Sequence, residues 1–348
     1  MPELVVGVLL GIVFVLILVL PFFVKRAEHN LELFLLIMGV LSVTAAWAWE
    51  LEVVKDAVTH PLMITGAVLG AGALAHLGRE HLKRWLLRLL AIAPLPAVVG
   101  AMVGLLGLLS SFITAIIAGI LLAEFLSIMP LSRRSRINVA VLGCFAIGLG
   151  AALTPVGEPL STIVIQKLQG PPHNADFFFL ARLLGIEILV GIVVAAAISR
   201  FFVQHDSPSA EVDQHDHPRE TWVSVPIRAA KVYVFVAALT LLGAGFSVVV
   251  DKYLAHVPGP ALYWANVSSA VLDNATLAAA EIGPSLHVDQ IRDVVLALMI
   301  AGVILIPGNI PNIITASQLR ISMKEWARLG VPLGFGALLV GFLTVLFL

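Results

Sequence analysis

Residues Leu89–Ala123 read LLAIAPLPAVVGAMVGLLGLLSSFITAIIAGILLA, a run of 35 residues without Asp, Glu, Lys or Arg. A helix of about 20 apolar residues crosses the roughly 30 Å hydrocarbon core of a bilayer. Seven further runs lack these four residue types for about 20 positions or more: Leu4–Val24, Ala57–Gly78, Ile137–Gly157, Val232–Val250, Tyr253–Leu272, Val294–Leu319 and Leu329–Leu348. The runs predict an all-α polytopic membrane protein.

Composition excludes several other classes. The chain of 348 residues is 59% hydrophobic and 12% charged, whereas soluble domains are about 45–50% apolar and about 25% charged. Its net charge of −1 offers no basic surface for nucleic acid. The single cysteine, Cys144, excludes an internal disulfide, a thiolate zinc site and an iron–sulfur cluster. Walker, His-Glu-x-x-His, Gly-x-Ser-x-Gly and Gly-x-Gly-Asp motifs are absent from the sequence, so we expect no enzyme and no cofactor.

The distribution of basic residues predicts how the helices are oriented. Cytoplasmic loops are enriched in Lys and Arg. Sixteen of these residues fall in alternate connections, which we predict to be cytoplasmic, and five fall elsewhere; the sixteen lie within 25–30, 78–91, 130–137, 199–231 and 320–328. Both termini are then outside. No basic region precedes the first apolar run, which disfavours a cleaved signal peptide.

Two apolar segments must enter and leave the membrane on one side. Basic clusters flank Leu89–Ala123 at both ends, which predicts a hairpin at 89–129 that turns near Ser110 and Ser111. A second hairpin, at 256–286, is predicted to turn near 268–276. Spacing alone leaves open whether the hairpins are re-entrant or cross the membrane twice. The other predicted spans are 4–24, 31–49, 61–77, 137–169, 177–200, 227–250, 290–319 and 328–348, of which 137–169 and 290–319 are interrupted.

Similar segments recur in the same order and indicate an inverted repeat. The pairs are Ser110–Ala118 with Ser268–Thr276, Gly157–Pro159 with Asn309–Pro311, and Ala181–Gly185 with Ala327–Gly330. Arg182 is predicted outside and Arg328 inside, so the copies would have opposite orientations. The predicted organisation is N-terminal scaffold spans at 1–60, a first repeat at 61–203, a linker at 204–226 and a second repeat at 227–348.

Each copy contains a helix interrupted by proline and glycine. The segments are Leu153-Thr-Pro-Val-Gly-Glu-Pro159 and Ile306-Pro-Gly-Asn-Ile-Pro-Asn312. Proline removes a backbone donor and clashes with the preceding turn. Carbonyls freed in hydrocarbon need a partner, which a cation or water supplies. Two such segments at matching positions indicate a site near the membrane midplane; purely structural proline kinks are the alternative.

Carboxylates inside apolar segments are the candidate ion-binding groups. Asp273 and Asn274 lie at the predicted turn of the second hairpin, and Glu158 lies in the first interruption. A carboxylate within the membrane is costly and marks a functional site by default. Because a proton and a cation compete for one carboxylate, such a residue can exchange one for the other.

The remaining polar residues within or between spans have less specific interpretations. Glu187 is either a structural hydrogen-bonding group or a proton-relay position. Glu124 and Glu281, on the return arms of the hairpins, are expected nearer the interfaces, in snorkelling or capping roles. The linker is expected to be solvated, with metal binding or pH sensing as the alternative for its histidines, which include His205, His215 and His217.

This order of a serine-rich hairpin, a Pro/Gly-broken helix and an inverted copy with an Asp-Asn hairpin resembles the ion-transporter superfamily. That superfamily includes arsenite-permease-like pumps, sodium–proton antiporters of the NhaD type and sodium–dicarboxylate symporters. The chain is most similar to its short prokaryotic predicted cation transporters, over about residues 89–348. The resemblance implies re-entrant hairpins, sodium sites where each hairpin tip meets a broken helix, a homodimer with elevator-like movement, and the inner membrane of a prokaryotic cell.

By position, the resemblance implies two binding sites. The first comprises Ser110, Ser111 and Thr114 with Thr154, Gly157 and Glu158; the second comprises Ser268, Ser269, Asp273, Asn274 and Thr276 with Gly308, Asn309 and Asn312. The Ser-Asn-Thr hairpin tips of the dicarboxylate symporters are absent in that form, which counts against a carboxylate substrate. The first hairpin also lacks an Asp-Asn pair, so the two sites would differ.

The leading hypothesis is a secondary active transporter that exchanges Na⁺ or another monovalent cation for H⁺ at Asp273. Its partners would be membrane lipid and small ions. One alternative is a cation- or proton-coupled carrier of arsenite or an organic acid, for which Arg182 and Arg292 are the candidate anion-binding residues. A subunit that only scaffolds other proteins is a further alternative.

Overall fold

The computed structural model describes residues 3–24, 26–27, 30–203, 224–249, 259–272 and 274–347. These residues form helices and turns, with no strand among them. Four of the helices are long and apolar enough to cross a membrane, over Leu95–Ile113, Phe179–Phe201, Ala229–Phe246 and Met323–Thr344. The predicted all-α class is therefore confirmed, and the apolar helices indicate a membrane-embedded protein.

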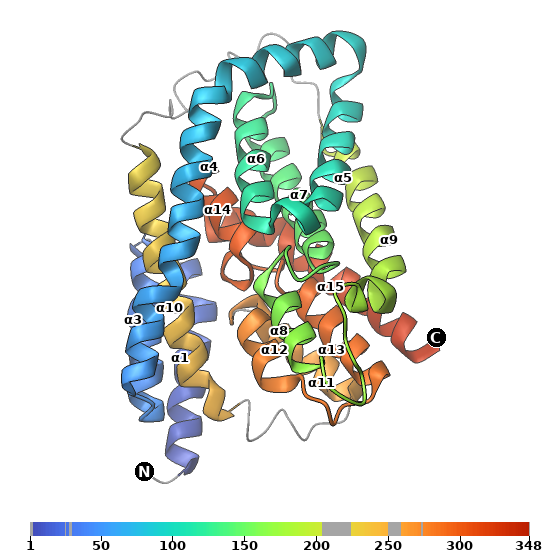
Figure 1. The fold of residues 1–348 in the computed structure, drawn as a ribbon. Coiled ribbons are helices and arrows are strands. Elements are labelled where there is room, and N and C mark those ends of the chain that lie inside the picture. The colour runs from blue at the N-terminus through green and yellow to red at the C-terminus, as the bar shows by residue number, and fades with distance from the viewer. Residues whose placement is uncertain are drawn as a thin grey trace.

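One group of helices packs together along one side of the molecule (Figure 1). It consists of α1 (Glu3–Phe23), α3 (Leu31–Ala46), α4 (Leu51–Ile92) and α10 (Ser224–Val249). Small residues bring α3 and α10 close, since a Cβ on Gly245 would lie 2.4 Å from the Ser42 hydroxyl oxygen. Although α10 follows the predicted linker in sequence, it packs mainly against α3 and α4.

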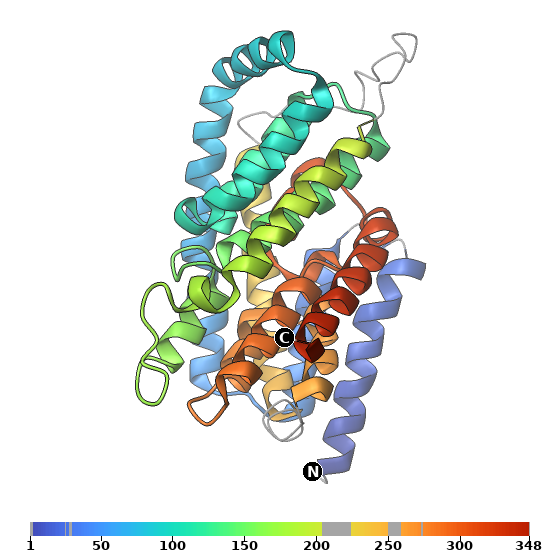
Figure 2. The ribbon, with the colours of Figure 1, turned by 90° about the vertical axis from the view of Figure 1, so that its right-hand side faces the viewer.

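The long helix α4 differs from the prediction. The predicted span at 61–77 and the predicted cytoplasmic residues 78–91 belong to a single helix that runs from Leu51 to Ile92. The helix continues past the predicted span because 79–92 contains mostly Leu, Arg, Lys and other good helix formers and no proline. The helix instead bends, and its last part runs across one end of the molecule (Figures 1 and 2).

The second group of helices contains two hairpins and two broken helices. In the first half these are α5 (Leu95–Ile113), α6 (Ala115–Ile128), α7 (Arg133–Ala151), α8 (Pro159–Lys167) and α9 (Phe179–Phe201). In the second half they are α11 (Gly259–Ala265), η2 (Asn266–Ala270), α12 (Asn274–Glu281), α13 (Val288–Ala301), η3 (Ile306–Gly308), α14 (Ile310–Leu319) and α15 (Met323–Phe347).

The first hairpin turns later than predicted. Ser110 and Ser111 lie inside α5, where their hydroxyls donate to carbonyl oxygens three residues earlier, at 2.7 and 2.9 Å. The chain turns at Thr114 instead, with φ 74°, and the Thr114 hydroxyl accepts a hydrogen bond from the Ile117 amide in the first turn of α6. Serine hydroxyls satisfied within a helix do not end it, and for this reason the prediction of a turn at the serines fails.

The two broken helices run in opposite directions through the centre. Figure 1 shows α7 leading down to α8, and α13 leading up to α14. The return arm of each hairpin packs against the broken helix of the other half, α6 against α14 and α12 against α8. On the outside, α9 exposes Ile186, Val190 and Val193, as expected of a helix that faces lipid.

Candidate functional site

The first break is held to the tip of the first hairpin. Helix α7 ends at Ala151, and α8 starts at Pro159. A Cβ on Gly157 would lie 2.0 Å from the Ala151 carbonyl oxygen, so only glycine allows this close approach. The Thr154 hydroxyl donates to the Ser111 carbonyl oxygen at 2.6 Å. The Ala115 backbone amide donates to the Gly157 carbonyl oxygen at 2.8 Å.

The second break repeats these features. A Cβ on Gly308 would lie 2.4 Å from the Gly302 carbonyl oxygen and 2.6 Å from that of Ser269, in the second hairpin. The Asn312 amide group donates to the carbonyl oxygens of Gly302, at 2.9 Å, and Leu305, at 3.0 Å. Each break is thus closed by a glycine and contacts its own hairpin.

Polar side chains bridge both breaks in the same way. The Ser161 hydroxyl donates to a carbonyl oxygen seven residues earlier, that of Thr154, at 2.7 Å. Asn312 bonds to the carbonyl oxygen seven residues before it. Before each break, a serine of the hairpin contacts the helix that leads into the break. The Ser110 hydroxyl donates to the Ile147 carbonyl oxygen of α7 at 3.0 Å, and the Ser269 hydroxyl donates to the Leu298 carbonyl oxygen of α13 at 3.4 Å. The contacts around the two breaks therefore correspond pair by pair.

The breaks meet at Glu158 and Asn309. The Asn309 amide nitrogen donates to a Glu158 carboxylate oxygen at 3.4 Å, across 151 residues of sequence. Both residues are N-caps with similar extended backbones, at φ −155° and ψ 161° for Glu158 and φ −154° and ψ 147° for Asn309. Their exposed fractions are only 5% and 4%. We call the two breaks, residues 152–158 and 302–309, the crossing.

The crossing brings together most of the predicted site residues. In contact with it or within it lie Ser111, Thr154, Gly157, Glu158, Ser269, Gly308, Asn309 and Asn312. Ser110 contacts α7 at the Ile147 carbonyl oxygen, before the break, and Thr114 directly precedes Ala115, whose amide donates to the Gly157 carbonyl oxygen. The Asn274 amide nitrogen lies 3.5 Å from the position of a Cβ on Gly302. Ser268 is partly buried in η2, and Thr276 lies in α12. Asp273, His205, His215 and His217 lie outside the described residues.

Glu187 has a partner that spacing did not suggest. It forms an ion pair with Arg292, which joins α9 to α13. The side chains are 19% and 18% exposed. This contact fits the structural alternative for Glu187, and the proton-relay role stays a prediction.

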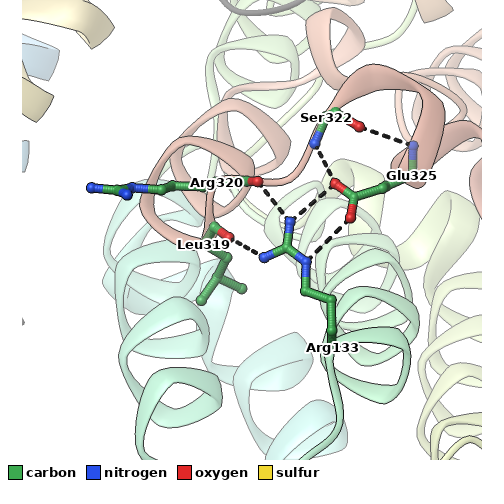
Figure 3. Close-up of polar contacts among 5 residues, drawn as sticks. All are labelled: Arg133, Leu319, Arg320, Ser322 and Glu325. Atoms are coloured by element: carbon green, nitrogen blue, oxygen red, sulfur yellow. Dashed lines mark hydrogen bonds and ion pairs between the residues drawn. The ribbon is translucent and has the colours of Figure 1, made fainter. Parts of the chain in front are cut away.

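Arg133 fixes one end of the crossing helices (Figure 3). From the first turn of α7 it donates to the carbonyl oxygens of Leu319 at 2.8 Å and Arg320 at 2.7 Å, at the end of α14. It also pairs with the Glu325 carboxylate of α15 at 3.0 Å. Ser322 and Glu325 complete a cap on α15, because each accepts a hydrogen bond from the backbone amide of the other.

The expectation that Glu124 and Glu281 snorkel is wrong, and their depth in the membrane stays a prediction. Their exposed fractions are 0% and 6%. Each return arm packs on the broken helix of the other half, which covers these carboxylates. The Gln318 side-chain amide of α14 donates to the Glu124 carboxylate at 3.1 Å.

Sequence reasoning also missed Ser161. Aligning Glu158 with Asn309, rather than Gly157 with Asn309, would have matched Ser161 to Asn312.

The crossing has the chemistry of a cation site. It gathers a buried carboxylate, side-chain amides and backbone carbonyls at helix ends. The Asn312 amide oxygen is buried and has no hydrogen-bond partner within the described parts of the chain. Oxygen ligands of this kind suit hard cations, and interrupted helices supply them in transporters.

Comparison with known proteins identifies a family but not an activity. The family described as "Protein of unknown function (DUF1646)" matches residues 7–348. A search of curated proteins returns no match to the chain.

Proposed function

The chain belongs to this family of unknown function, and we propose that it is a secondary active transporter that exchanges Na⁺ or another monovalent cation for H⁺. The observation that carries the proposal is the contact between Glu158 and Asn309 where two broken helices cross. Transporters built from inverted repeats bind substrate and ions at such discontinuous helices.

Two observations support an inverted repeat with re-entrant hairpins. The bridging contacts correspond pair by pair in the two halves, and the broken helices run in opposite directions. The return arms α6 and α12 have only 14 and 8 residues. At about 1.5 Å per residue even α6 extends roughly 21 Å, less than the roughly 30 Å hydrocarbon core. The hairpins are thus proposed to turn back within the membrane.

In this mechanism Glu158 binds either a proton or the cation, never both. A buried negative charge is costly, so a proton or a cation would bind to the carboxylate in each loaded state. The amide oxygens of Asn309 and Asn312 and the carbonyl oxygens of the breaks would complete the coordination of the cation. Asp273, which lies outside the described residues, is proposed as a second carboxylate of the ion pathway.

The geometry favours a cation over an anion as substrate. Arg182 is paired with Asp176 at 2.7 Å, with both side chains more than half exposed. The hydrogen bond from Arg182 lowers the pKa of Asp176 below its ordinary value, so the pair stays charged at neutral pH. Arg292 is paired with Glu187. Both candidate anion-binding residues therefore already have carboxylate partners, while Glu158 would repel an anion at the crossing.

The test is cation-dependent proton movement in proteoliposomes that contain the purified protein and a pH-sensitive dye. Na⁺, Li⁺, K⁺ and Ca²⁺ are added in turn. We expect one monovalent cation to move protons, Glu158→Gln to abolish the response, and the exposed control Glu52→Gln to retain it. Asp273→Asn tests the second carboxylate.

Two results would contradict the proposal. If no cation moves protons with the wild-type protein, the antiporter assignment fails, and uptake of an organic acid or arsenite is measured instead. If Glu158→Gln exchanges ions at the wild-type rate, the crossing is not the ion site. The homodimer, the prokaryotic inner membrane and the external termini also remain part of the proposal, and cross-linking and cysteine accessibility in intact cells test them.

A further inference from the structure

A second buried polar group lies in the hairpin of the second half, apart from the contact between the breaks. Asn266, at the start of η2, is 0% exposed, and Glu281, at the end of α12, is 6% exposed. The Asn266 side chain interacts with the Glu281 carboxylate. In the described parts of the chain, however, neither polar atom of Asn266 and neither carboxylate oxygen of Glu281 has a hydrogen-bond partner of ordinary geometry.

This situation is unusual because buried polar atoms in proteins nearly always have partners. The hydroxyl of Ser268, two residues after Asn266, is a further buried atom with no partner among the described residues. Five polar side-chain atoms without a hydrogen bond of ordinary geometry among the described residues thus lie in one short hairpin. A cation bound between Asn266 and Glu281 would satisfy the oxygen atoms of this set.

Among the residues that the structure describes, the helices around Glu281 place no cationic partner on its carboxylate. Helix α12 packs against η2, α8, α10 and α13. Lys167 of α8 is exposed, and Tyr263 of the adjacent α11 donates to the Leu338 carbonyl oxygen. Among the described residues no ion pair joins Glu281. The helices packed against α12 carry further titratable residues, which are Arg228, Lys231 and Tyr233 at the start of α10, and Asp289, Arg292 and Asp293 on α13.

The charged groups with described partners are occupied elsewhere. Lys231 pairs with Glu32 at 2.9 Å, and Arg292 pairs with Glu187. A buried carboxylate without a cationic partner is costly in its charged form, so it must bind a proton or a cation. Its two oxygens and the Asn266 amide oxygen are hard ligands, and one negative charge matches one monovalent cation.

We propose that Glu281 and Asn266 form a second cation site, at which a monovalent cation replaces the carboxyl proton. This inference rests on the proposed transport function for its role: the site lies at the end of α12, which packs beside α8 and α13 on one side of the crossing (Figure 1). An ion moving to the crossing from that side would bind there first.

Infrared difference spectroscopy on the full-length protein in lipid tests the site without requiring transport. Spectra are recorded in choline chloride and then in NaCl, LiCl or KCl at the same ionic strength and pH. We expect at least one of these cations to remove a protonated-carboxyl C=O band and to produce carboxylate bands. Glu281→Gln should eliminate this change, Glu281→Asp should shift the band, and Asn266→Ala should raise the cation concentration needed by about tenfold.

The matched control is Glu124→Gln, which removes a buried carboxylate of the other hairpin that has Gln318 as its donor. It should leave the Glu281 band and its cation dependence unchanged. The proposal is overturned if no carboxyl band depends on Glu281, or if that band is the same in choline and in every cation.

Failure of this inference can be separated from failure of the proposed function. A cation-sensitive Glu281 band without proton movement in proteoliposomes would leave the second site in place and refute exchange. Exchange that requires Glu158, combined with a cation-insensitive Glu281, would refute only the second site.

Discussion

Gly157→Ala is the most direct perturbation of the crossing. The new Cβ would lie 2.0 Å from the Ala151 carbonyl oxygen and 2.6 Å from its carbonyl carbon. Carbon–oxygen contacts in proteins are about 3.3 Å or longer, so the two backbone segments must separate by about 1 Å. Neither can yield as a flexible side chain would, because both contacts are with backbone atoms.

The displacement should affect both stability and transport. Overpacking of a closely packed interior costs about 1–3 kcal/mol, and more when backbone must move. The Asn309–Glu158 hydrogen bond is already long, at 3.4 Å, and a shift of about 1 Å would break it. Since misplacement by about 1 Å at a reaction site can reduce rates by about 100-fold, we expect cation–proton exchange to fall by at least about tenfold.

The assays are thermal unfolding of the detergent-purified variant, followed by tryptophan fluorescence, and exchange in proteoliposomes. Gly308→Ala should behave in the same way, because its Cβ would lie 2.4 Å from the Gly302 carbonyl oxygen. Gly170→Ala is the matched control, since nothing lies within 4 Å of its added Cβ. If Gly157→Ala matches Gly170→Ala in both assays, the crossing does not require this close approach and the reasoning is wrong.

Three further variants test the contacts that position the crossing. Arg292→Gln leaves the partly buried Glu187 without its cation and should cost about 1–3 kcal/mol; most of this should return in the Arg292→Gln/Glu187→Gln double variant, as measured by thermal unfolding. Asn312→Leu deprives two break carbonyls of a donor and should cost about 2 kcal/mol or more, with exchange lost at temperatures where the protein is still folded. Arg133→Lys loses the two-oxygen contact with Glu325 and at least one of the hydrogen bonds to the Leu319 and Arg320 carbonyl oxygens. Because the contact is partly exposed, the variant should cost about 1 kcal/mol in the same assay.

Charge distribution was enough to predict most helices, because apolar runs and basic clusters are local properties of the chain. The broken helices ended within a few residues of the predicted interruptions, since proline and glycine act on the backbone where they stand. Helix α4 was predicted less well. Its basic residues mark the edge of an apolar segment but do not end a helix.

The residues of the candidate site also differ in whether local sequence features could predict them. Glu158, Asn309 and the two break glycines could be found from the sequence because the chemistry and the backbone break coincide there. The pair Glu187–Arg292 and the burial of Glu281 depend on which helices pack together, and no spacing rule provides that. Glu281 was placed near an interface because it stands at the end of a short arm, whereas the packing of α12 against α8 buries it.

The difference between the two halves at the crossing has a physical consequence. Equivalent N-cap positions carry Glu158 in one half and Asn309 in the other, and the two side chains touch. Two carboxylates at this distance could not both be ionised without a bound cation between them. One carboxylate beside one amide instead gives the contact a single negative charge, which one proton or one monovalent cation neutralises. A one-for-one exchange at Glu158 would therefore leave the charge of that pair unchanged, so the energetic cost of burial is similar in the two loaded states and neither is trapped.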